Sequence, residues 1–147
     1  MPRTRRALVI SLGAALLGAV PPPVTAHAIG TPVYRLSIDR LGYVAPDGTV
    51  TLSGAYQCSG GNAGEPVYVA SNVRQSSQYV HAIGGTRAEC DGQEHHWRNT
   101  GRPEDPAVRP GGAKVEATLM RMRRGAMGLP LPTFLAARTQ DVTLLRR

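Results

Sequence analysis

Apolar and polar residues alternate with a period of two along most of the chain after residue 32. The clearest run is Thr49–Cys58, in which Val50, Leu52 and Tyr56 share one face with Cys58. Successive side chains of a β-strand point to opposite faces, so this run predicts a half-buried strand. No stretch between residues 29 and 147 has a sustained helical period, and the pattern therefore predicts an all-β fold.

Similar runs predict seven or eight short strands, separated by Gly, Pro, Asn and Asp. Their expected ranges are Val33–Asp39, Thr49–Cys58, Pro66–Arg74, Gln78–Ile83, Thr86–Cys90, Glu94–Arg98, Ala113–Met120 and Thr139–Leu145. Pro66–Arg74 is interpreted as a central strand. Asp91-Gly92 favours a tight hairpin that would pair Thr86–Cys90 with Glu94–Arg98 and hold Trp97 near Cys90. So many short strands predict an antiparallel, immunoglobulin-like β-sandwich rather than a closed barrel.

Two segments have no strand pattern. Asn99–Gly112 is rich in proline, glycine and charge, and is interpreted as an exposed connection. Arg121–Ala137 combines arginines with apolar and proline residues, a composition typical of a contact surface when it is exposed. The candidate binding residues are Arg121, Arg123, Arg124, Leu129, Leu131 and Phe134. In the alternative interpretation Leu129, Leu131 and Phe134 fold back and cap one end of the sandwich.

The first 28 residues have the pattern of a signal peptide. Basic residues in Pro2–Arg6 precede the apolar stretch Ala7–Val20, and Ala26-His27-Ala28 offers cleavage after Ala26 or Ala28. The apolar stretch is shorter than the roughly 20 residues that span a bilayer. We therefore expect residues 29–147 to form a single secreted, extracellular domain without a membrane span after cleavage.

The chain has two cysteines, Cys58 and Cys90, and an exported chain with two cysteines predicts one disulfide bond between them. A closed loop of about 30 residues stabilises a fold by roughly 3 to 4 kcal/mol in the chain-entropy model. The alternative, a redox or metal site made by two free thiols, is disfavoured because the C-x-x-C spacing is absent.

Composition argues against nucleic-acid binding. Of the 17 basic residues only Lys114 is a lysine, and one Phe and one Trp offer little surface for base stacking. Loss of the three arginines in residues 1–28 lowers the formal net charge from +7 to +4. This modest positive charge favours adhesion to anionic wall polymers without identifying a partner.

The candidate metal or acid–base residues are Asp91, Glu94, His95 and His96, with His81 on a neighbouring run. His95 and His96 would point to opposite faces of a strand, and no zinc-site spacing is present. We therefore expect no metal and no cofactor.

Catalytic serine and phosphate-loop motifs are also absent. Ser53-Gly54 and Ser59-Gly60 lack a nucleophile-elbow context, and no helix follows the glycines at 60, 61 and 64. We expect no catalytic residues.

Several motifs resemble those of a family of secreted actinobacterial domains of unknown function. They are Asp47–Gly54, Tyr56–Gly60, Ile83–Arg87, Cys90–Gly92, His96-Trp97 and Val142–Leu144. This resemblance implies no reaction, ligand or catalytic residue. A looser resemblance to bacterial immunoglobulin-like domains rests on the strand that leads to Cys58, although Trp97 follows the second cysteine instead of the first.

These observations predict a secreted, monomeric, non-enzymatic domain that binds an envelope protein or wall polymer through its loops. The alternative is a secreted carrier that holds a small apolar ligand between its sheets. A hydrolase forms the third class, and its activity would depend on His95 or His96.

Overall fold

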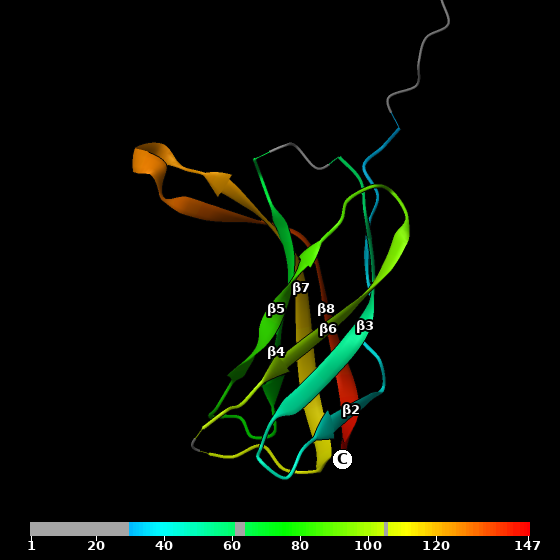
Figure 1. The fold of residues 1–147 in the computed structure, drawn as a ribbon, viewed down its shortest axis with the longest axis vertical. Coiled ribbons are helices and arrows are strands. Elements are labelled where there is room, and N and C mark those ends of the chain that lie inside the picture. The colour runs from blue at the N-terminus through cyan, green and yellow to red at the C-terminus, as the bar shows by residue number, and fades with distance from the viewer. Residues whose placement is uncertain (1–29, 61–63, 105) are drawn as a thin grey trace, which may run out of the picture. The chain divides into compact units, whose positions relative to one another are not determined.

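The computed structural model describes residues 30–60, 64–104 and 106–147; the predicted signal peptide, residues 1–28, lies outside them. These ranges contain eight β-strands and one short 3-10 turn, η1 (Figure 1). The elements are β1 (Tyr34–Leu36), β2 (Leu41–Val44), β3 (Val50–Cys58), β4 (Val67–Arg74), β5 (His81–Ala88), β6 (Glu94–Gly101), β7 (Gly111–Arg124), η1 (Ala126–Gly128) and β8 (Pro130–Arg146). The prediction of an all-β fold is confirmed. Among the described residues, no helix has the length and hydropathy needed to cross a membrane.

The strands form one mixed sheet in the order β1-β3-β2-β8-β7-β4-β5, with β6 paired to β3. β4 lies between β7 and β5, as expected for a central strand. The expectation of purely antiparallel pairing is wrong, because β2 and β8 run parallel from Leu41↔Thr143 to Val44↔Arg146. The pattern of the sequence did not indicate β2, the short strand that joins β3 to β8 and makes this parallel contact.

The predicted hairpin around Asp91-Gly92 is also wrong, because β6 pairs with β3 along its length instead of with the strand before it. A steric fit accounts for this partner: Trp97 lies opposite Gly54, where a Cβ atom would come within 2.7 Å of the indole nitrogen. With that Cβ absent, Trp97 Nε1 donates a hydrogen bond to the Ser37 carbonyl at 3.0 Å. The two runs expected at 78–83 and 86–90 form the single strand β5.

The hydrophobic core is one cluster to which every strand contributes. Its most deeply buried members are Trp97, Leu52, Ile83, Leu119, Leu144, Val50, Val69, Val73 and Val115. The alternating burial along β3, β4 and β7 follows the predicted period of two. The polar/apolar pattern therefore predicts correctly which side chains of these strands face the core.

Asn99 forms a buried polar network inside this core, so its assignment to an exposed connection is wrong. Only 2% of its surface is exposed. Its amide nitrogen donates to the Val69 carbonyl at 3.0 Å and to Ser71 Oγ at 2.9 Å. Its amide oxygen accepts a hydrogen bond from Thr86 Oγ1 at 2.7 Å. These bonds link β6 to β4 and β5, the strands that lie at the far end of the sheet order.

The predicted disulfide bond between Cys58 and Cys90 is confirmed. It joins the end of β3 to the connection between β5 and β6. Gly92 N–H also donates to the Cys58 carbonyl at 2.9 Å, and Gln57 Nε2 donates to the Gly92 carbonyl at 2.7 Å. The bond and its neighbouring hydrogen bonds therefore hold the β5–β6 connection against the end of β3.

Replacing Asn99 with alanine should lower the free energy of unfolding by about 1 to 3 kcal/mol, because it removes the hydrogen bonds that the Asn99 amide makes with the Val69 carbonyl, Ser71 and Thr86 inside the core. Urea unfolding followed by Trp97 fluorescence measures this change. Asn72→Ala on β4 is the control, since Asn72 is only partly buried and belongs to no such network. Equal stability of the two variants would contradict a stabilising role for the network.

Candidate functional site

The segment Arg121–Ala137, for which no strand was predicted, belongs to the two longest strands of the described chain. β7 continues to Arg124, η1 makes the turn, and β8 begins at Pro130. The sequence pattern fails here because this part of the hairpin is solvated and needs no alternation of apolar and polar residues to bury one face. Residues 120–134 are called the arm below.

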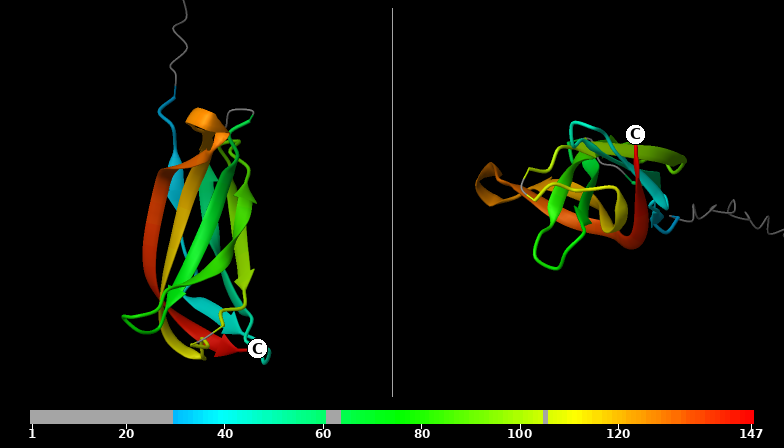
Figure 2. Two further views of the ribbon diagram at one scale, coloured as in Figure 1. Left: turned by 90° about the vertical axis from the view of Figure 1, so that its left-hand side faces the viewer. Right: turned by 90° about the horizontal axis from the view of Figure 1, so that it is seen from below.

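The arm projects from the other strands, as two views perpendicular to each other show (Figures 1 and 2). A β-bulge lies at its base: Leu119 pairs with Ala136, but the next residue, Met120, pairs with Phe134 and leaves Leu135 unpaired. A bulge bends a strand and changes the direction of the side chains that follow it. The bulge therefore provides a physical reason for the change of direction at the base of the arm.

Cross-strand pairing sorts the side chains of the arm onto two faces, because directly opposed residues lie on the same face. Met120↔Phe134, Met122↔Pro132 and Arg124↔Pro130 share one face. We call Met120, Met122, Pro130, Pro132 and Phe134 the apolar face of the arm. The other face carries Arg121↔Thr133 and Arg123↔Leu131. Of the candidate residues, Phe134 and Leu131 thus point in opposite directions.

Several apolar residues of the arm are open to solvent, whereas Met120 and Met122 are partly buried. The exposed fraction is 68% for Phe134, 64% for Leu129 and 97% for Met127 at the turn. Leu131 is half exposed and packs close to Gly125, where a Cβ atom would meet its side chain. These residues do not cap the end of the folded strands, so the alternative interpretation of this segment is wrong.

Two prolines restrict how the arm can bind. Met122 N–H donates to the Pro66 carbonyl, away from β8, so Met122 and Pro132 form a pair without mutual hydrogen bonds. The backbone nitrogen of Pro132 therefore lies on the free edge of β8, as does that of Pro130 two residues earlier. Because proline has no N–H, this edge offers no donor for an added strand at either position. A partner can still contact the arm through its side chains.

Arg121 has a structural role at the base of the arm. Its guanidinium donates to Tyr34 Oη at 3.3 Å and to the Gly60 carbonyl at 3.0 Å. Its Nε is buried and has no hydrogen-bond partner among the described residues. Arg123 and Arg124 are exposed. Of the three candidate arginines, two are therefore accessible to a partner.

The second candidate cluster is divided by the structure. His95 Nε2 lies 2.9 Å from Asp91 Oδ1, and Glu89, which sequence reasoning missed, completes a group whose ligand atoms all lie within 4.8 Å of one another. Glu94 and His96 flank His95 on β6 and belong to the opposite face of that strand. Glu89 and Asp91 directly precede and follow Cys90 in the sequence. Their position on either side of a predicted disulfide bond is the signal that could have identified Glu89.

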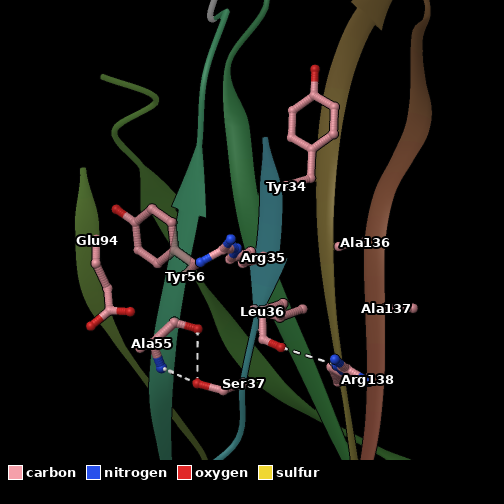
Figure 3. Close-up of a pocket in the computed structure, with 10 residues that line it drawn as sticks. All are labelled: Tyr34, Arg35, Leu36, Ser37, Ala55, Tyr56, Glu94, Ala136, Ala137 and Arg138. Atoms are coloured by element: carbon pink, nitrogen blue, oxygen red, sulfur yellow. Dashed lines mark hydrogen bonds between the residues drawn. The ribbon is translucent and has the colours of Figure 1, made fainter. Parts of the chain in front are cut away.

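A groove of about 490 Å³ lies across β1 (Figure 3). Figure 3 shows Glu94 on one side and Arg138 on the other, with Arg138 Nε donating to the Leu36 carbonyl at 3.3 Å. The lining mixes charged and apolar groups: Tyr34, Arg35, Leu36, Ser37, Ala55, Tyr56, Glu94, Ala136, Ala137 and Arg138. The groove has the size of a small-molecule site.

The serines considered for hydrolysis make other contacts. Ser53 Oγ donates to Asp39 Oδ2 at 2.6 Å, and Ser59 Oγ accepts the Val33 N–H at 3.0 Å. Neither hydroxyl is hydrogen-bonded to a histidine in the described part of the chain. A serine–histidine pair for nucleophilic catalysis is thus not formed at these two positions.

A family model described as a family of unknown function, DUF6299, matches residues 32–147. The chain belongs to this family. The match includes the arm, the disulfide bond and the cluster of Glu89, Asp91 and His95. No curated protein and no solved structure matches the chain. Membership of DUF6299 therefore indicates no activity, and a function has to be inferred from the sites of this chain.

Within this DUF6299 chain, hydrogen bonds lower the pKa of the Asp91 carboxyl below its ordinary value of 3.8. The bond to His95 is the main cause, and the Gln93 N–H adds to it. Because the pKa is lower in the folded state, these contacts stabilise the fold above pH 3.8, and that stabilisation is lost as the pH falls through the lowered pKa.

A carboxyl-carbon NMR titration should give Asp91 a midpoint below 3.8, and the His95→Ala variant should move it upward because the main hydrogen bond is lost. Asp47 is the internal control. The pKa of its carboxyl is lowered by the Thr49 N–H and hydroxyl, so it should stay low in both proteins. An Asp91 midpoint that does not respond to the loss of His95 would contradict the assigned cause.

Proposed function

We propose that this member of DUF6299 is an exported, non-enzymatic binding domain whose arm contacts a protein of the cell envelope. The observation that carries the proposal is the apolar face of the arm. Phe134, Pro130 and Pro132 of that face are exposed, and monomeric proteins leave apolar patches exposed mainly where these meet a partner. Export is supported by the signal-peptide pattern of residues 1–28 and by the disulfide bond, which persists in oxidising compartments.

The chemistry of the arm favours a partner with an apolar pocket and an acidic rim. Phe134 offers an aromatic anchor, and aromatic side chains and arginines are enriched at the centres of protein interfaces. Arg124 lies on the apolar face and Arg123 on the opposite one, so positive charge accompanies both sides of the arm. Two such arms would repel each other through these arginines, which argues against self-association and for an acidic partner.

We further propose that the sheet is arranged as an immunoglobulin-like sandwich. The strand order supports this: β1, β3 and β6 match strands A, B and E, while β8, β7, β4 and β5 match G, F, C and C′. Under this proposal β2 links the two layers of the sandwich, because it pairs with β3 on one side and with β8 on the other. The disulfide differs from that of antibody domains, because Cys90 lies between β5 and β6 and not on β7.

Replacing Phe134 with serine should abolish capture of the envelope partner without changing the melting temperature, because the side chain is exposed. The experiment is a pull-down with the tagged chain from its own culture, with medium, wall and membrane fractions kept apart. Loss of an aromatic anchor costs about 2 kcal/mol or more, which is roughly a 30-fold weaker affinity. Tyr79→Ser is the matched control, since Tyr79 is also an exposed aromatic residue but lies outside the arm.

Two outcomes would overturn this proposal. The first is equal capture by the Phe134→Ser and Tyr79→Ser variants. The second is retention on a wall polymer alone, lost with added salt and unaffected by Phe134→Ser, since charge rather than the apolar face would then account for binding.

The groove across β1 favours a second candidate function, a carrier of a small ligand. Arg35 and Arg138 beside Tyr34 and Tyr56 suit an anionic or amphipathic compound better than a purely apolar one. The native mass of protein purified from its producing organism tests this candidate. An additional mass of a few hundred daltons that disappears on denaturation would support a carrier.

A further inference from the structure

We propose that Glu89, Asp91 and His95 form a binding site for a divalent first-row transition-metal ion, with Zn²⁺ as its representative. The site lies in the connection between β5 and β6 and at the start of β6. It is independent of the proposed function of the arm, since none of its residues belongs to residues 120–134.

The spacing of the donor atoms suits one metal ion. One atom from each residue lies within 4.8 Å of the other two, and Asp91 Oδ1 is 2.9 Å from His95 Nε2. In a tetrahedral Zn²⁺ site two ligands with metal bonds of about 2.1 Å are separated by about 3.4 Å. Asp91 Oδ1 and His95 Nε2, 2.9 Å apart, would separate by about 0.5 Å to hold an ion in place of their hydrogen bond.

The surrounding contacts hold the ligands in position. Cys90, between Glu89 and Asp91, is bonded to Cys58 on β3, and Gly92 N–H donates to the Cys58 carbonyl. The Tyr56 hydroxyl accepts the Glu89 N–H at 3.0 Å, and the Tyr56 ring stacks on the His95 ring with centroids 5.5 Å apart. Ligands held before the ion arrives lose little conformational entropy when they bind it.

The donor types select the class of ion. One imidazole nitrogen with two carboxylate oxygens favours Zn²⁺ or Cu²⁺ over Ca²⁺ or Mg²⁺, which take oxygen ligands. Two carboxylates and a neutral imidazole balance the charge of a dication. All three residues are at least partly exposed, so the remaining coordination positions are open to water or to a group from a partner.

The test is a Zn²⁺ titration of the chain without a polyhistidine tag, by calorimetry and by equilibrium dialysis with elemental analysis. One ion should bind per chain. Asp91→Asn and Glu89→Gln should each weaken binding by at least about tenfold, since even the loss of an outer-shell partner costs 10- to 100-fold in affinity. His95→Ala should behave in the same way, and urea unfolding checks that each variant remains folded.

His96→Ala and Glu94→Gln are the matched controls, because these residues lie beside His95 on β6 but on its other face. Both should bind Zn²⁺ as the parent chain does, and so should Phe134→Ser, which separates this site from the arm. The proposal is overturned if the parent binds no ion, if the three ligand variants bind it unchanged, or if His96→Ala weakens binding as much as His95→Ala.

Discussion

The buried amide of Asn99 is the constraint on which the arrangement of the strands depends. Among the strands that the structure describes, β6 pairs with β3 alone, yet through Asn99 it also bonds to the Val69 carbonyl on β4 and to Thr86 on β5. Ser71 extends the network by donating to the Ile83 carbonyl at 2.9 Å. Apolar contacts alone tolerate sliding between packed strands, whereas a buried amide with several fixed partners is satisfied in one register. The network thus sets how β6 faces β4 and β5.

The arm is stabilised by other contacts than the core, because its apolar face does not pack against the hydrophobic core. Its backbone is stabilised by pairing of β7 with β8, and its base is held by Arg121, which reaches Tyr34 and the Gly60 carbonyl. An exposed apolar ribbon would ordinarily invite strand addition and aggregation. The prolines at 130 and 132 remove that hazard on one edge, while the side chains that a partner would contact remain accessible.

How much the sequence predicts differs between the core and the arm. Alternation identified β3, β4 and the inner half of β7, because burial of one face imposes a period of two on these strands. It missed β2, which is too short to show a period, and the outer half of the β7–β8 hairpin, where both faces meet solvent. Asn99 was assigned to a loop because polarity alone does not distinguish a solvated amide from one whose hydrogen bonds are made inside a core.

Among the candidate sites, local spacing placed Asp91 and His95 in one group but could not separate Glu94 and His96 from them. The alternation of side chains along β6 does so, and Glu89 joins the group in the folded chain, where the Cys58–Cys90 bond and the Tyr56 hydroxyl hold its backbone beside β3. For the arm, composition selected the correct segment. The assignment of these side chains to the two faces of the arm required the register, which the bulge at Leu119/Met120 determines.

The two sites share one anchor, the end of β3 and the residues that follow it. Cys58 holds the turn that carries Asp91, and the Gly60 carbonyl, two residues later, accepts a hydrogen bond from Arg121 at the base of the arm. Figure 1 shows the arm and the β5–β6 connection at the same end of the strands. A contact surface on a projecting ribbon loses affinity if the ribbon must be ordered on binding. Under the proposed function, anchoring the base of the arm beside the disulfide bond would reduce that cost, and the covalent bond would then serve recognition as well as stability.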